Sequence, residues 1–200
     1  MIGYFLLSAD PFHVAHIALP VYCLNNGLVD KAYIVPALQN PWKNRYVATF
    51  EERCDMIRKC VKNIKNCELE DIEKENLYPY SCYTLENLYN KYGKGQNIHY
   101  VIMGCDTFNS IQEWRFFDEM IKDRFEFIVF ARDGEVPSVK NLNYTLVAED
   151  MFSGISSTLV RKLIAEGKTA FPYLPECILK DCYRIYSDPY RIKDFTVENL

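Results

Sequence analysis

The sequence predicts an α/β protein with a doubly wound, mostly parallel sheet. Apolar runs of strand length alternate with segments that have the 3.6-residue apolar repeat of helices, which is typical of parallel strands joined by helices. Polar segments with turn-forming residues follow the strands. The 200 residues are 49% hydrophobic, enough to bury one sizeable core. We therefore expect a single domain over residues 1–186, with a C-terminal helical part at about 154–186 and a tail of unknown role at 187–200.

Each expected element has its own local signal. Strands are expected at 2–8, 31–36, 67–72, 98–104, 125–131 and 145–147. Helices are expected at about 16–25, 49–61, 81–93, 108–121, 154–166 and 175–185. Gly27 follows the first helix as a C-terminal cap. Thr49 is a suitable N-cap for the second helix, where Glu51 and Glu52 favour the positive end of the helix dipole.

Composition restricts the class of protein. A net charge of -4 argues against a nucleic-acid partner, although local cations can still bind a small anion. No apolar run approaches the roughly 18 residues of a membrane helix, and no basic leader precedes the first strand. The eight cysteines include no CxxC pair, so we expect a cytoplasmic protein with reduced thiols. A homo-oligomer is compatible with the sequence, which does not determine the oligomeric state.

The polar segments that follow the strands are expected to meet in one place. Ligands of open α/β sheets bind outside the carboxyl ends of the strands. The segments expected at that edge are Ser8 to His16, Asn40 to Lys43, Asp106, Arg132 and Ser156 to Arg161. They predict one site assembled from the whole chain.

His13 and His16 are two of the three histidines in the chain. Their spacing of three puts them on one helical face, just after the turn at Asp10-Pro11. Ring N–H groups beside the backbone N–H groups of a helix start suit phosphate binding. The alternatives are a metal site or two surface histidines. Two histidines with no obviously spaced third ligand make a poor zinc site, so we expect no metal held by protein side chains.

Ser156, Ser157 and Thr158 precede an apolar helical segment, so they fit a helix N-cap. The same hydroxyl and backbone N–H groups are suited to ATP phosphates, and the two interpretations are compatible. Arg161 lies one turn further and is suited to bidentate phosphate binding.

Two motifs carry a family resemblance. Ser-x-Asp-Pro-x-His-x-x-His at 8–16 and Ile-Ser-Ser-Thr-x-x-Arg at 155–161 are similar to the two signatures of the nucleotidyltransferase superfamily. The middle of the chain resembles the nicotinate (nicotinamide)-mononucleotide adenylyltransferases. The matching pieces are Asn40-Pro41-x-Lys43, Tyr80-Ser81-x-x-Thr84-Leu85, Gly104-x-Asp106-x-Phe108, Trp114 and Arg132-x-Gly134. The resemblance covers roughly 2–186 and implies the Rossmann-like fold of HxGH-type nucleotidyltransferases.

The resemblance also implies an activity: adenylyl transfer from ATP, with Mg²⁺, to nicotinate or nicotinamide mononucleotide. The implied catalytic residues are His13, His16 and Arg161. The implied ATP and phosphate contacts are Ser8, Asp10, Lys43, Arg132, Ser156, Ser157 and Thr158. The implied mononucleotide contacts are Tyr80, Ser81, Thr84, Asp106 and Trp114. Two alternatives stay open: transfer to another phosphorylated acceptor, such as phosphopantetheine or a polyol phosphate, and nucleotide binding without catalysis.

The chain departs from the family pattern next to these motifs. Leu6 and Leu7 replace a pair of glycines, and Ala15 replaces the glycine between the histidines. A residue with a Cβ limits how closely a backbone approaches a nucleotide. Ala9 replaces the usual aromatic residue, and Trp42 replaces a histidine. Reduced activity or a shifted substrate is compatible with these changes.

Overall fold

The computed structural model describes residues 1–39, 45–93, 95–131, 134–148 and 153–192. Its strands are β1 (Ile2–Leu7), β2 (Lys31–Pro36), β3 (Cys67–Leu69), β4 (His99–Gly104), β5 (Glu126–Phe130) and β6 (Tyr144–Val147). They form one sheet in the order β3-β2-β1-β4-β5-β6, in which all neighbouring strands are parallel. The connections reverse direction between β1 and β4, so the prediction of a doubly wound parallel sheet is confirmed.

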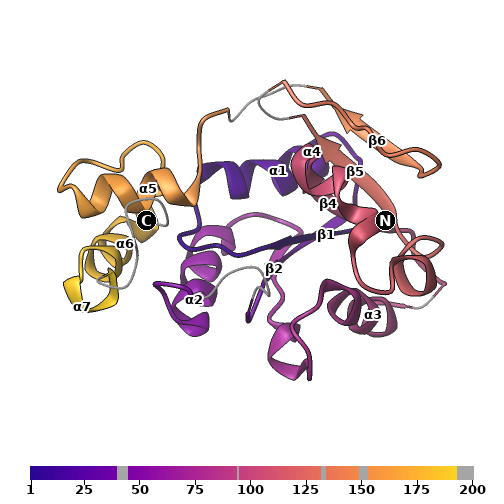
Figure 1. Cartoon of the computed structure of the whole chain (residues 1–200), viewed down its shortest axis with the longest axis horizontal. Coiled ribbons are helices and arrows are strands. Elements are labelled where there is room, and N and C mark those ends of the chain that lie inside the picture. Colours follow the sequence, from indigo (N-terminus) through magenta and orange to yellow (C-terminus); the bar gives the residue numbers. More distant parts are fainter. Residues whose placement is uncertain (40–44, 94, 132–133, 149–152, 193–200) are drawn as a thin grey trace.

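Helices cover both faces of this sheet (Figure 1). The helices of the described residues are α1 (Val14–Asn25), α2 (Phe50–Val61), α3 (Ser81–Lys91), α4 (Cys105–Asn109), α5 (Ser157–Ala165), α6 (Leu179–Tyr186) and α7 (Pro189–Ile192). Neighbouring side chains of a strand point to opposite faces, so Phe5 and Tyr4 enter different cores. Phe5 packs in a cluster with residues of α1, α2, α5 and α6, and Tyr4 in one with residues of α3 and α4. In Figure 1, α5, α6 and α7 form one group, far from β6 in the view.

The expectation of one helix at 108–121 is wrong. α4 ends at Asn109, and a 3₁₀ helix (Ile111–Glu113) and a short π-helix (Phe117–Ile121) follow. Phe116 interrupts the region because its φ of 55° lies in the left-handed region, which an α-helix excludes.

Several boundaries also differ from the expected ones. α1 begins at Val14, so His13 is its N-cap residue. The strand expected at 67–72 ends at Leu69, and a 3₁₀ helix (Ile72–Glu75) begins three residues later. α7 lies inside the segment that the sequence left unassigned. Among the described residues, no helix combines the length and apolar character needed to cross a membrane.

Candidate active site

A cleft of about 450 Å³ opens at the carboxyl ends of β1 and β4, where the strand order reverses. The first residues of α1, α3, α4 and α5 contribute to its walls. Nine residues predicted for the site line it: Ser8, His13, His16, Ser81, Asp106, Trp114, Ser156, Ser157 and Thr158. The fold therefore brings segments from both ends of the chain into one cavity.

The other predicted residues are placed differently. Asp10, Tyr80, Thr84 and Arg161 are not among the cleft-lining residues. Tyr80 directly precedes α3, and its ring lies 4.9 Å from the guanidinium of Arg115. Lys43 and Arg132 lie outside the described residues.

His13 and His16 stack on each other at the start of α1. Their ring centres are 3.5 Å apart and the ring planes differ by 20°. The backbone N–H of His13 donates to Nδ1 of His16 at 3.3 Å. Because Nδ1 accepts this hydrogen bond, the neutral ring of His16 carries its proton on Nε2. His16 is thereby set up to donate a hydrogen bond from Nε2.

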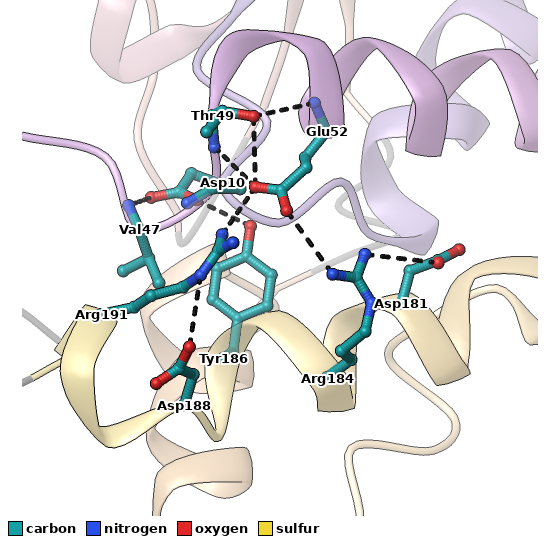
Figure 2. Close-up of polar contacts among 10 residues, drawn as sticks. Asp10, Val47, Thr49, Glu52, Asp181, Arg184, Tyr186, Asp188 and Arg191 are labelled. Carbon is teal, nitrogen blue, oxygen red and sulfur yellow. Dashed lines mark hydrogen bonds and ion pairs between the residues drawn. The ribbon is translucent and has the colours of Figure 1, made fainter.

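Asp10 is buried behind the cleft and its carboxylate binds three protein donors (Figure 2). The backbone N–H groups of Val47 and Ala48 donate to it at 2.9 and 3.0 Å. The hydroxyl of Tyr186 donates to it at 2.7 Å. Burial and the Asp10 carboxylate raise the pKa of Tyr186, so this hydroxyl keeps its proton and acts as a donor. The structure thus gives Asp10 a connecting position, between the loop after β1, the start of α2 and the end of α6.

Arg161 reinforces this connection. Its guanidinium donates to the backbone carbonyl of Asp10 and, at 3.0 Å, to the hydroxyl of Thr158. Burial lowers the pKa of Arg161, and the nearby Asp10 carboxylate opposes that effect. Arginine stays charged in proteins, so a buried cation contacts the loop at 8–16, which the sequence predicts to bind phosphate.

Glu52 ties the last helices to α2 (Figure 2). Its carboxylate accepts from the backbone N–H of Thr49 at 2.9 Å and from Arg191 at 2.7 Å, and Arg184 lies 3.7 Å away. Burial acts to raise the pKa of Glu52, but the Arg191 guanidinium and the Thr49 amide outweigh it and the pKa lies below its ordinary value. Glu52 therefore joins the first turn of α2 to α6 and α7.

The serines of α5 combine capping with exposure to the cleft. The Ser156 hydroxyl accepts from the backbone N–H of Leu159 at 3.1 Å and caps the helix. The Ser157 hydroxyl donates to the carbonyl of Pro11 at 2.9 Å, which joins α5 to the loop after β1. The segment therefore caps α5, as expected, and lines the cleft, while its contact with ATP phosphates stays a prediction.

Arg53 is a residue of this region that the sequence reasoning missed. It is 1% exposed and donates to the carbonyls of Ser8 and Ala37, both at 2.7 Å. Its guanidinium also lies 4.0 Å from the centre of the Tyr46 ring. Arg53 therefore joins the carboxyl ends of β1 and β2. One signal was available: a cation four residues before Ile57, on the apolar side of α2.

Glu73 was missed as well, and it connects Thr84 to the cleft. Glu73 lines the cleft and is 6% exposed. It accepts from the backbone N–H of Leu38 at 2.7 Å and from the Thr84 hydroxyl at 2.9 Å. Thr84 also accepts from the Asn76 side-chain amide at 2.8 Å. Thr84 therefore lies behind the cleft wall, with Glu73 in front of it.

We expect Glu73→Gln to change how stability depends on pH. Burial raises the pKa of Glu73 above its ordinary value of about 4.5, and its hydrogen bonds only partly offset this. The charged form is disfavoured on folding, so the Glu73 contribution to wild-type stability falls as the pH rises from that value through the raised pKa. The variant lacks this titration. Its free energy of unfolding, measured in urea from acid to neutral pH, should rise relative to wild type by at most about 1.4 kcal/mol per pH unit. A difference that is constant with pH would contradict the argument.

Asp106 and Trp114 line the cleft from the segment that follows β4. Asp106 is exposed in the first turn of α4. A Cβ on Gly104 would lie 2.5 Å from a carboxylate oxygen of Asp106, so a side chain at position 104 would make the Asp106 carboxylate shift. Trp114 is partly buried against the core that contains Tyr4. An acidic and an aromatic side chain thus line the same cleft as the histidine pair.

Leu6 and Leu7, which stand where the family resemblance predicts glycines, line the cleft from β1. Their side chains pack against the cores on opposite faces of the sheet. The loop that follows is constrained too: Ala9 has a φ of 56°, a conformation that residues with a Cβ adopt rarely.

The described parts of the chain contain no group of three or more histidine, cysteine, aspartate or glutamate side chains that could hold a metal ion. Of the carboxylates that line the cleft, Glu73 accepts two protein donors, whereas Asp106 is exposed. Mg²⁺ in phosphoryl-transfer sites is held mainly by water and substrate phosphates, with one or two carboxylates. One exposed carboxylate, Asp106, is compatible with an Mg²⁺ ion that enters the cleft bound to the phosphates of a ligand.

Comparisons with known proteins show which sequences the chain resembles. The cytidylyltransferase-like family matches the chain over residues 6–163. The probable nicotinate-nucleotide adenylyltransferase of Aliarcobacter butzleri is 30% identical over 175 residues, which are 87% of this chain and 90% of that protein. The protein of the same name from Aquifex aeolicus is 31% identical over 134 residues, covering 66% of this chain and 78% of the relative.

One solved structure shows the same fold over almost the whole chain. The Plasmodium falciparum nicotinic acid mononucleotide adenylyltransferase complexed with NaAD has a TM-score of 0.76 and 18% sequence identity, with 98% of both chains covered.

Proposed function

This chain belongs to the cytidylyltransferase-like family and to its nicotinate-nucleotide adenylyltransferases, and we propose that it transfers the adenylyl group of ATP to nicotinate mononucleotide. The products are the adenine dinucleotide and pyrophosphate. One observation supports this most strongly: the stacked histidines, the start of α5 and the Asp106–Trp114 wall line a single cleft.

The reaction needs positioning more than acid–base chemistry. A phosphate oxygen of the mononucleotide, already ionised at neutral pH, attacks the α-phosphorus of ATP, and the bond to pyrophosphate breaks. No covalent intermediate is required. Catalysis then consists of aligning the two reactants and stabilising charge on the phosphate oxygens.

The cleft residues divide between the two substrates. His16, through Nε2–H, and His13 donate to the α-phosphate at the start of α1, assisted by the positive end of the helix. Ser157, Thr158 and the first N–H groups of α5 bind the other ATP phosphates, with Ser8 at the edge of the same region. Mg²⁺ arriving with ATP would supply neutralisation of phosphate charge, and the described residues contain no group of three or more histidine, cysteine, aspartate or glutamate side chains that would hold it instead. Asp10 and Arg161 act behind the loop as positioning residues. Lys43 and Arg132 are proposed as further phosphate ligands from the family motif alone.

The opposite wall receives the mononucleotide. Trp114 stacks on the pyridine ring, Ser81 lies beside it at the start of α3, and Asp106 accepts hydrogen bonds from ribose hydroxyls. Tyr80 and Thr84 support this pocket from outside the cleft surface, Thr84 through its hydrogen bond to Glu73.

The direct test is pyrophosphate release by purified protein with ATP and each of several acceptors. We expect turnover with nicotinate mononucleotide well above turnover with phosphopantetheine or a polyol phosphate. Parallel measurement with nicotinamide mononucleotide decides between the acid and the amide. Turnover no greater than that of the His16→Ala variant with every pyridine mononucleotide would disprove the proposal.

Replacing Trp114 should affect one substrate selectively. Trp114→Ala is expected to raise the KM for the mononucleotide by about tenfold, from the loss of stacking and of apolar contact, and to leave the KM for ATP unchanged. Trp114→Phe keeps an aromatic face and should recover most of the loss. Equal increases in both KM values would mean that Trp114 only supports the fold.

A second candidate function is nucleotide binding without turnover, favoured by the two leucines in the cleft wall. Calorimetry distinguishes it: the protein would bind ATP but release no pyrophosphate, and Leu7→Gly would restore turnover. Turnover by the wild-type protein excludes this function.

A further inference from the structure

We infer that Cys60 and Cys177 form a reversible disulfide that fastens the C-terminal helical part to α2. Their sulfur atoms are 3.5 Å apart in the thiol form, although the residues are 117 positions apart in the chain. Cys60 lies in the last turn of α2, and Cys177 in the 3₁₀ helix Glu176–Ile178 that precedes α6. This pairing does not depend on the proposed enzymatic activity.

Contacts on either side hold the two sulfurs in place. Lys59 donates to Asp181 of α6 at 2.5 Å, next to Cys60 in the sequence. One turn earlier in α2, the sulfur of Met56 lies 3.5 Å from the Cys182 sulfur. A disulfide brings the sulfur atoms about 1.5 Å closer than they are here, which side-chain rotation can supply.

Cys60 and Cys177 differ in access to solvent, and this gives the reaction an order. Cys177 is exposed, Cys60 is half-buried, and the other six cysteines, all among the described residues, are buried. Burial and the neighbouring Cys177 thiol raise the pKa of Cys60, so Cys60 is the poorer initial nucleophile. Cys177 therefore reacts first with an oxidant from solution.

The oxidant is a small-molecule disulfide such as oxidised glutathione. The Cys177 thiolate attacks one of its sulfurs, forms a mixed disulfide and releases one glutathione thiolate. Cys60 then attacks the Cys177 sulfur, and the second glutathione leaves with the proton of Cys60. The two protein thiols lose two electrons and two protons in total, and one glutathione disulfide becomes two glutathione thiols. Excess dithiothreitol reverses the reaction.

The test equilibrates the whole protein with oxidised or reduced glutathione and then blocks remaining thiols with N-ethylmaleimide. Mass spectrometry of the digested oxidised sample should find a peptide pair joined through Cys60 and Cys177, which dithiothreitol separates. The melting temperature of the wild type should rise by about 5–10 °C on oxidation, because the bond closes a long loop.

Cys177→Ser is the matched control, since it changes one atom at an exposed position. Its melting temperature should match that of the reduced wild type in both buffers, with no linked peptide. In Cys60→Ser the reaction should stop at the first step, with glutathione bound to Cys177 as a mixed disulfide. Glutathione held on Cys177 of the wild type without a cross-link, or a cross-link between other cysteines, would overturn the inference.

Discussion

His16→Ala is expected to lower kcat for dinucleotide formation by about 10²–10³-fold, the effect of removing one preorganised donor to a charge that develops in the transition state. The KM values should change much less, because ground-state binding also uses the start of α5 and the Trp114 wall. Steady-state kinetics with both substrates measures the two effects separately.

Two amide variants sharpen this result. His16 accepts at Nδ1 from the backbone N–H of His13, which leaves Nε2 as the donor of the neutral ring. In His16→Gln the amide reaches the position of Nε2, whereas in His16→Asn it reaches only that of Nδ1. Glutamine should therefore recover part of the activity and asparagine very little. If asparagine recovers more activity than glutamine, the donor is Nδ1 and the assignment to Nε2 is wrong.

Asp10→Asn should reduce the free energy of unfolding by about 2–5 kcal/mol, because a buried amide cannot replace a carboxylate that accepts three donors. In either orientation its NH₂ group faces a protein N–H or hydroxyl, and the buried Arg161 loses its neighbouring negative charge. Urea unfolding with an unchanged m-value measures this loss.

Tyr186→Phe is the matched comparison, since it removes one of those donors and leaves the carboxylate with two backbone partners. We expect a loss of about 1–2 kcal/mol, clearly smaller than that of Asp10→Asn. If Asp10→Asn is as stable as wild type, Asp10 does not connect the three segments in solution.

The sheet was predictable because its signals are local. Each long strand is a continuous apolar run, and the polar residues that follow the strands belong to the one edge that a parallel sheet creates. His13, Asp106 and Ser156 could thus be expected in a single cleft without knowledge of any distance between them. The region at 108–121 was not predictable, because the left-handed conformation of Phe116 has no signature in the residue type.

The buried positions of the Asp10 and Arg161 side chains could not be predicted from the sequence, for a different reason. A carboxylate and a guanidinium in phosphate-binding motifs are expected to face the ligand. Here their partners are Val47, Tyr186 and the backbone carbonyl of Asp10 itself, and their proximity depends on the whole topology. Arg53 and Glu73 were missed because charged side chains are expected to be exposed to solvent. Their burial depends on backbone partners that the sequence does not reveal.

The hydrogen bond from Tyr186 to Asp10 also bears on the order of events during synthesis. Asp10 is synthesised long before Tyr186, which follows it 176 positions later. Arg161, which holds the same loop, is 151 positions away. Contacts this far apart in sequence form late, after most of the chain has been made. The loop at 8–16 therefore gains these contacts only after α5 and α6 have been made.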